Sequence, residues 1–109
     1  MTEIDVRDMM TQIPNYFNPE KAQGVVAVIQ CIFTGNQASN WVINIQDQIC
    51  KVDEGVAEDP DITIKAKAEI GVKLFRGEMD PMRAFLLGRV KVSGDLNLGM
   101  KLVDFFDRP

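Results

Sequence analysis

The last third of the chain carries clear signals for the boundaries between its secondary-structure elements, and these signals constrain the fold more than any other feature. Asp80 can accept hydrogen bonds from the free N–H groups of a helix start, and Pro81 suits the first helical position. Gly88 can adopt the left-handed backbone conformation that ends a helix. A short helix is therefore predicted over residues 80–87.

A strand and a final helix are predicted to follow. Apolar and polar residues alternate over residues 90–93, which is typical of a half-buried strand. Gly94 and Asp95 then turn the chain into a helix that starts at Asp95. The polar residues of this helix form one narrow stripe at spacings of four, three and four: Asn97, Lys101, Asp104 and Arg108. Because the rest is apolar or Gly, the helix must be buried on several sides or contact something other than protein.

The hydrophobic pattern upstream predicts two helices and four strands. The first helix covers residues 5–16, and Pro14 should end or kink it near Ile13. Strands are predicted at residues 24–34, 41–46, 49–54 and 62–66, with the first one central and the first three forming a meander. A second helix follows at residues 67–76. Strands that mostly precede helices are typical of an α+β domain, in which helices cover one face of a mainly antiparallel sheet.

Length and composition favour an ordinary soluble protein. The 109 residues, 46% of them hydrophobic and 26% charged, predict a single domain over residues 1–109. No apolar run approaches the roughly 20 residues that cross a bilayer. The first residues are acidic where a signal peptide would be basic, and the last are not a peroxisomal address, so a cytoplasmic location is expected.

The charge distribution argues against nucleic-acid binding, since the net charge is −4. Residues 1–64 hold 3 basic and 10 acidic side chains and carry −7, whereas residues 65–109 hold 9 basic and 6 acidic and carry +3. The basic half could favour anionic headgroups or coenzyme phosphates, although a solvated surface is the simpler interpretation.

Residues that catalysis usually requires are absent. The chain has no histidine, no Walker loop and no Ser-His-Asp set, so we expect no enzymatic activity, no cofactor and no metal site. The acidic loop at residues 55–61 lacks the spacing of a calcium-binding loop and is expected to be solvated. Cys31 and Cys50 are expected to be free, buried thiols. The surplus of apolar residues near the C-terminus could all be core, by composition alone.

Residues 77–102 closely resemble the signature segment of the sterol carrier protein type 2 family. Further matches lie at residues 17–22, 34–35 and 60–64 and at Trp41, in the same order and at the same spacing, so the resemblance covers essentially the whole chain. Two features depart from the family pattern. The second helix has Ala66-Lys67 where an acidic or hydroxyl residue is usual, and a peroxisomal tag is missing.

The resemblance implies a five-stranded sheet covered by about four to five helices, with a hydrophobic tunnel closed by the C-terminal helix. Family members bind fatty acids, acyl-coenzyme A, sterols, isoprenoid lipids or phospholipids and catalyse nothing. By this resemblance, the final helix is expected to move to admit the lipid. The residues expected to line the tunnel are Phe75, Met79, Met82, Phe85, Leu86, Met100, Leu102, Val103, Phe105 and Phe106.

Two alternatives to a simple lipid carrier remain open. The domain could present a lipid to a membrane enzyme, for instance in isoprenoid quinone biosynthesis. It could also be an interaction or dimerisation module. In that case the pocket is collapsed, and the apolar final helix of the domain is buried against a partner subunit. The expected partners are a hydrophobic lipid and, transiently, a membrane surface, with no nucleic acid and with the chain as a monomer or homodimer.

Overall fold

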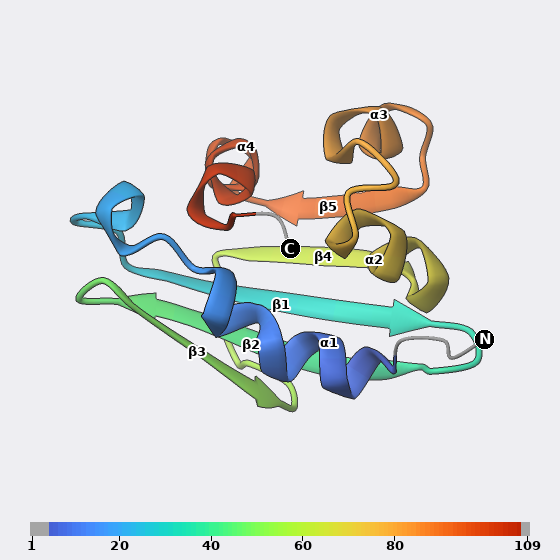
Figure 1. Ribbon diagram of the computed structural model, residues 1–109, viewed down its shortest axis with the longest axis horizontal. Helices are drawn as coiled ribbons and strands as arrows, with labels where there is room; N and C mark the ends of the chain where they lie inside the picture. The colour runs from blue at the N-terminus through green and yellow to red at the C-terminus, as the bar shows by residue number, and fades with distance from the viewer. Residues whose placement is uncertain (1–4, 108–109) are drawn as a thin grey trace.

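A five-stranded mixed sheet is the framework of the computed structural model, which describes residues 5–107. The strands lie in the order β3–β2–β1–β4–β5 (Figure 1). Their bounds are β1 Ala27–Thr34, β2 Ser39–Gln46, β3 Ile49–Glu54, β4 Ile62–Lys67 and β5 Val90–Gly94. Only β1 and β4 pair in parallel, whereas the other neighbouring strands are antiparallel. The predicted α+β class, the central first strand and the three-stranded meander are confirmed.

Three of the four α-helices in the described residues begin after an aspartate whose side chain caps them. The four are α1 Val6–Gln12, α2 Ala68–Phe75, α3 Pro81–Leu86 and α4 Leu96–Leu102, with short 3₁₀ helices η1 Ile13–Tyr16, η2 Pro19–Ala22 and η3 Val103–Phe105. The Asp80 side chain accepts a hydrogen bond from the Arg83 N–H at 2.9 Å. The Asp95 side chain accepts one from the Leu98 N–H at 3.1 Å. At α2, Lys67 makes no side-chain cap, as its sequence implied.

Two predicted boundaries need correction. The first strand begins at Ala27 rather than at residue 24, because Gly24 has a φ of 72° and still belongs to the preceding turn. The final helix ends as an α-helix at Leu102, and Phe106 is already extended. The predicted polar stripe holds as far as it is described, since Asn97, Lys101 and Asp104 are all exposed and the 3₁₀ helix Val103–Phe105 carries the chain on for one more turn; Arg108 lies outside the described residues. In α1, the predicted change near Ile13 is confirmed.

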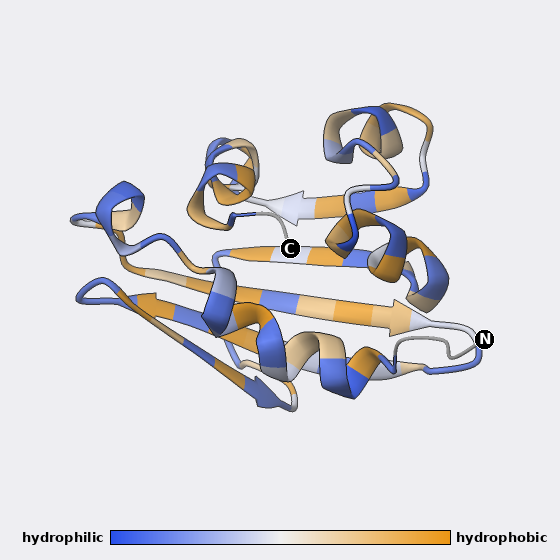
Figure 2. Ribbon diagram, in the orientation of Figure 1, coloured by the Kyte–Doolittle hydropathy of each residue, from blue (hydrophilic) through white to orange (hydrophobic). Residues whose placement is uncertain are grey.

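The main core lies between the sheet and the helices. Along β1, Ala27, Ile29 and Cys31 are buried on the face that packs against Met9 and Met10 of α1. Figure 2 shows β1 as hydrophobic along most of its length. A smaller cluster of buried residues joins β4 and β5 to α2 and α3. The helices therefore cover one face of the sheet, as the segregated pattern of elements predicted.

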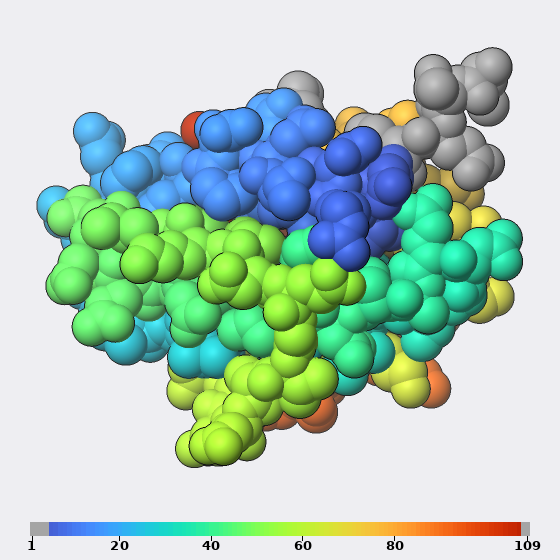
Figure 3. Space-filling model, turned by 90° about the horizontal axis from the view of Figure 1, so that it is seen from below, coloured from blue at the N-terminus to red at the C-terminus, as the bar shows by residue number. Residues whose placement is uncertain are grey.

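The connection from β3 to β4 crosses the opposite face of the sheet, because β2 and β1 lie between these strands. The view from the β3 edge shows α1 in blue on one side and the yellow-green loop 55–61 on the other (Figure 3). The buried Gln30 side chain holds this loop: its Nε2 donates to the Gly55 carbonyl at 3.0 Å, and its Oε1 accepts from the Ala57 N–H at 2.7 Å. The acidic loop is thus a fixed crossover.

Candidate functional site

Helix α4 leaves much of its apolar surface uncovered. None of its seven residues is fully buried. Leu98 and Leu102 pack partly against the main core, whereas Leu96 is exposed and Met100 is 62% exposed. The helix lies close to the sheet at Gly99, where an added Cβ would lie 2.9 Å from Ile62 Cδ1. The sheet and the other helices therefore leave part of the apolar surface of α4 uncovered.

Helix α3 adds further exposed apolar side chains. Only Ala84 of its six residues is fully buried. Met82 and Phe85 are partly open to solvent, and Leu86 and Leu87 are 75% and 63% exposed. Figure 1 shows α3 and α4 on the same side of the sheet, above opposite ends of β5. Single exposed apolar residues are common on protein surfaces, but two sets of them beside one strand make this side of the sheet a candidate binding surface.

The segment after α4 is tied to the N-terminal part of the chain. Phe106 forms an isolated antiparallel bridge with Phe17, and their ring centroids are 5.6 Å apart. The Asn18 N–H donates to the Phe105 carbonyl at 2.7 Å, and the Asp107 N–H donates to the Tyr16 carbonyl at 2.7 Å. Helix α4 is thus held at its C-terminal end.

The ten predicted lining residues divide into two groups of five. Phe75, Met79, Leu102, Phe105 and Phe106 point inward, and Met82, Phe85, Leu86, Met100 and Val103 are exposed. Four of the inward residues pack on the main core, whereas Met79 packs on the smaller cluster. The structure therefore brings Phe75, Leu102, Phe105 and Phe106 into one core but does not gather all ten around one space. Their role as a lipid wall stays a prediction.

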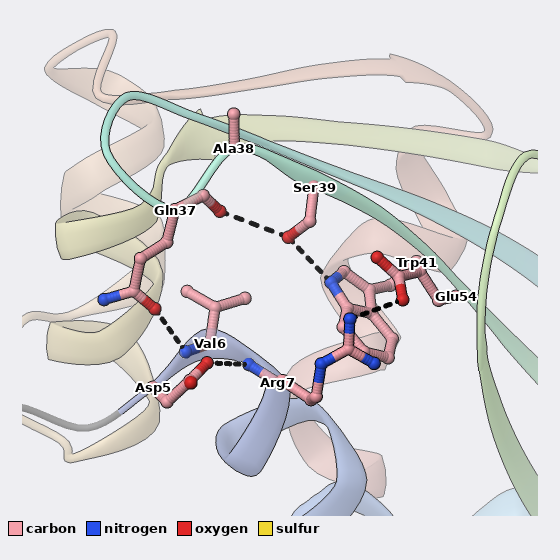
Figure 4. Close-up of a pocket in the computed structure, with 8 residues that line it drawn as sticks. All are labelled: Asp5, Val6, Arg7, Gln37, Ala38, Ser39, Trp41 and Glu54. Carbon is pink, nitrogen blue, oxygen red and sulfur yellow. Dashed lines mark hydrogen bonds and ion pairs between the residues drawn. The ribbon is translucent and has the colours of Figure 1, made fainter.

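A pocket of about 260 Å³ lies between the start of α1, the loop between β1 and β2, and the adjoining ends of β2 and β3 (Figure 4). Its polar groups are paired with one another. The Arg7 guanidinium contacts Glu54 Oε1 at 2.7 Å and lies 5.4 Å from the Trp41 ring centre. The Val6 N–H donates to Gln37 Oε1 at 2.6 Å. Because these groups already have partners, the pocket serves to dock α1 on the sheet.

A second pocket, of about 370 Å³, lies at the end of β4, and four of its nine lining residues are basic. Its lining residues are Thr34, Lys65, Ala66, Lys67, Glu69, Ile70, Gly88, Arg89 and Lys91. None of the ten predicted lining residues contributes to either pocket. Sequence reasoning did not locate the basic pocket, although Lys65 and Lys67 are two residues apart and so point to the same face of a strand.

The remaining reactive groups do not form a chemical site. Cys31 and Cys50 are free thiols, as predicted, and burial raises the pKa of Cys31 to about 12 and that of Cys50 to about 11. Such thiols are poor nucleophiles, because the thiolate is the reactive form. Within residues 5–107, no group of three or more Cys, Asp or Glu side chains could hold a metal ion. No helix in this range is long and apolar enough to span a membrane.

Comparison with known proteins identifies the family. The profile of the SCP-2 sterol transfer family matches residues 10–107. The chain belongs to this family. Its fold is also that of Sterol Carrier Protein 2 Like 2 from Aedes aegypti, with 25% sequence identity, a TM-score of 0.75, and coverage of 92% of this chain and 94% of that one. A solution structure of the palmitated form of that protein matches with 24% identity and a TM-score of 0.70, over 94% and 93% of the two chains.

Two other similar proteins place the SCP-2 fold in different contexts. The ubiquinone synthesis protein UbiJ-SCP2 shares the fold at 16% identity and a TM-score of 0.72, over 92% of this chain and 90% of that one. Hydroxysteroid dehydrogenase-like protein 2 from Xenopus laevis is 24% identical over 98 residues, which are 89% of this chain and 24% of that protein. The chain therefore spans a quarter or less of the length of these curated relatives.

Proposed function

We propose that this protein binds and carries a hydrophobic lipid in an apolar space bordered by α4. The observation that carries the proposal is the exposure of α4: four of its seven residues are Leu or Met, yet none is fully buried. Each methylene that a lipid buries contributes about 0.8 kcal/mol. A long acyl or isoprenoid chain thus needs only an apolar enclosure to bind, without specific hydrogen bonds.

The inward and the outward groups of predicted residues have different parts in this proposal. Phe75, Leu102 and Phe106 form the inner wall of the space, and Met100 and Val103 contact the lipid nearer the solvent. Methionine suits such a wall, because its flexible side chain adapts to guests of different shape. The ligand classes that we propose are fatty acids, acyl-coenzyme A, sterols and isoprenoid lipids. The palmitated form of the related Aedes aegypti protein supports a fatty acid. In this proposal the domain binds its ligand and does not transform it.

Helix α4 is the proposed lid. Its N-terminal end is held by the Asp95 N–H, which donates to the Asp61 carbonyl at 2.9 Å. Its C-terminal end is held by the bridge between Phe106 and Phe17. Between these two ends its contact with the sheet is limited mainly to Gly99 and the half-buried Leu98 and Leu102. A helix fixed at both ends but loosely covered in between could move outward to admit a lipid.

The test is a titration with a fluorescent fatty acid. We expect the double variant Met100→Glu/Val103→Glu to bind at least about tenfold more weakly, because two charges replace apolar contacts to the lipid. Both residues are exposed, so the fold should persist. This pair is preferable to truncation after Met100, which would also remove the buried Phe105.

The matched control is Val26→Glu/Val56→Glu, which changes two apolar residues that are also exposed and lie far from α4 in the chain. The control should bind like the unmodified protein. Unchanged affinity in the α4 variant, or an equal loss in the control, would contradict the assignment of α4 to the lipid site.

The exposed apolar residues of α3 and α4 also favour a second candidate, in which a partner subunit covers them. Native mass spectrometry of protein purified from its host separates the two. A co-purified lipid supports the carrier, and a ligand-free homodimer supports the interaction module. The mass of a co-purified isoprenoid would support a lipid-presenting role in quinone biosynthesis, which the shared fold with UbiJ-SCP2 makes worth testing.

A further inference from the structure

The sheet has an open face, which no helix within residues 5–107 covers, since both core clusters lie on the other face. The loop 55–61 crosses this open face between β3 and β4. Along β1, Ile29 and Cys31 lie in the core. Their neighbours Val28 and Ile32 therefore point to the open face, and they belong to neither core cluster. The open face thus has half-buried apolar side chains that a partner could cover.

One part of the open face is basic. Ala66 of β4 packs toward the helices, so Lys65 and Lys67 on either side of it point to the open face. Lys91 of β5 is paired directly with Lys65 and shares its side of the sheet. These three exposed lysines form a basic strip. Like charges at opposite positions of two strands repel each other, so an acidic partner would stabilise the pair.

Another part of the open face is acidic and projects from it. Figure 3 shows the loop 55–61 standing out from the sheet on the side away from α1. Glu58 and Asp59 in the middle of this loop are exposed, and Val56 is 74% exposed. The loop contains no basic residue. It therefore forms an acidic ridge with an apolar side chain beside the charges.

Hydrogen bonds hold the acidic ridge near both of its ends. The buried Gln30 donates to the Gly55 carbonyl at 3.0 Å and accepts from the Ala57 N–H at 2.7 Å. The Val28 N–H donates to Asp61 Oδ2 at 2.7 Å, and the Val28 carbonyl accepts from the Asp61 N–H at 2.8 Å. A ridge that is already fixed loses little conformational entropy when a partner binds it.

The ridge and the strip are not neutralised within the described chain. The ion pairs found in residues 5–107 include no residue of either region. The charges that β3 adds to the open face, Lys51 and Asp53, cancel each other. A face that carries an acidic projection and a separate basic area is complementary to a copy of itself. In a dimer whose twofold axis lies between the two regions, each ridge meets the strip of the other copy.

We propose that the open face is a homodimer interface, in which the acidic ridge of each copy lies on the basic strip of the other. Glu58 and Asp59 form ion pairs with the lysines of the strip. Val56 packs against Ile32, which is the β1 residue paired with Lys65. The inference goes beyond the proposed carrier function, because α3 and α4 lie on the other face of the sheet and stay free in this dimer.

Analytical ultracentrifugation of the full chain tests the dimer. At low salt the chain should sediment with twice its monomer mass of 12.2 kDa, and high salt should favour the monomer because it screens the ion pairs. The ridge variant Glu58→Lys/Asp59→Lys and the strip variant Lys65→Glu/Lys91→Glu should each raise the dissociation constant at least about tenfold. In both variants, like charges face each other across the interface.

A mixture of the ridge variant and the strip variant gives the sharpest test. In a heterodimer of the two, the lysines of one ridge meet the glutamates of the other strip, and the unchanged ridge meets the unchanged strip. Both contacts again join opposite charges, so the mixture should form dimers of nearly the original affinity. A defect in the fold of either variant would not be repaired by the other, so restored association can come only from contact between copies.

The control Lys73→Glu/Lys101→Glu makes the same charge reversal at exposed positions of α2 and α4, on the other side of the sheet. It should change the dissociation constant by less than about threefold. A chain that stays monomeric at low salt, or a mixture that does not associate, would overturn the proposal. A dimer that both reversals leave intact, or an equal loss in the control, would assign the interface to the helical side instead. Fatty-acid affinity should be the same in all variants, so failure of the dimer leaves the carrier function standing.

Discussion

At the scale of single residues, Gln30 decides how the loop between β3 and β4 is held. It is the buried polar side chain in the middle of β1 and is only 3% exposed. Its Nε2 donates to the carbonyls of Trp41 and Gly55, and its Oε1 accepts from the Ala57 N–H. A buried amide whose donors and acceptor are all used stabilises the one loop conformation that satisfies it.

The variant Gln30→Glu should destabilise the protein strongly, although the Glu side chain has almost the same size and shape as Gln. A carboxylate has no N–H to donate, so it would face two carbonyl oxygens in a buried site, and we expect a loss of roughly 3 kcal/mol or more. Urea unfolding measures this free energy. The exposed Gln46 of β2 is the control, and Gln46→Glu should change stability by less than about 0.5 kcal/mol. Equal effects at both positions would contradict the role of Gln30.

The two thiols predict a dependence of stability on alkaline pH. The folded state keeps Cys31 and Cys50 protonated above their ordinary pKa of 9.0, because burial raises both pKa values. As the pH rises past about 9, the unfolded chain releases these protons first, so the free energy of unfolding falls. Urea titrations from neutral to alkaline pH should show this decline. In Cys31→Ala/Cys50→Ala the slope should be smaller, and an identical slope would contradict the prediction.

At the scale of the elements, the junction between β5 and α4 depends on Gly94. Its φ is 101°, and an added Cβ would lie 2.5 Å from the Asp61 carbonyl oxygen. The Asp61 carbonyl also accepts from the Asp95 N–H at 2.9 Å, so the two chain segments cannot move apart freely. The proposed lid therefore starts from a rigid point.

Gly94→Ala should destabilise the protein more than Gly88→Ala. Gly88 also has a positive φ, of 74°, but nothing lies within 4 Å of its added Cβ. The free energy of unfolding of Gly88→Ala should therefore fall by only roughly 1–2 kcal/mol, which is the cost of a left-handed backbone conformation for a residue with a side chain. Gly94→Ala adds a backbone clash to this cost. Thermal melts of the two variants measure the difference, and equal losses would show that the clash relaxes.

At the scale of the whole molecule, the two ends of the described chain stabilise each other. Phe106, after α4, pairs with Phe17, between η1 and η2. Tyr16 also packs edge-on against Phe75 of α2, with ring centres 5.4 Å apart. Segments that are far apart in sequence are thereby connected on the helical side of the sheet.

Phe106→Ala should loosen α4 without unfolding the sheet. The lost ring contact removes apolar burial at the end of the helix, so the amide hydrogens of residues 96–105 should exchange faster. The amides of β1 and β2 should exchange at nearly their original rates, because their ladder does not involve Phe106. Hydrogen exchange followed by mass spectrometry resolves these segments. Uniformly faster exchange would mean that Phe106 supports the global fold and not α4 in particular.

Much of the fold was predictable because its signals are local. The side chains of Asp80 and Asp95 bind backbone N–H groups three residues away, so they mark helix starts locally. The alternation of apolar and polar residues in β4 likewise shows which face of the strand is apolar. The end of the final helix was mispredicted because Phe105 and Phe106 follow the pattern of a continuing helix. The bridge of Phe106 with Phe17 and the hydrogen bond from the Asn18 N–H to the Phe105 carbonyl, both about ninety positions apart in the chain, prevail over that pattern.

The candidate site was predictable only in part. The sequence indicated a surplus of apolar residues near the C-terminus, and the structure shows that half of the ten predicted residues are exposed. It could not indicate the basic pocket, since Lys65 and Lys91 meet only when β4 and β5 pair.

The sequence by itself therefore determined where the helices capped by Asp80 and Asp95 start, which faces of the strands are apolar, and the family to which the chain belongs. The tertiary structure alone decided the parallel pairing of β1 with β4, the path of the crossover loop and the clustering of the lysines. The physical reason is that capping and alternation depend on neighbouring backbone groups, whereas strand pairing depends on the free energy of burying surfaces from distant parts of the chain.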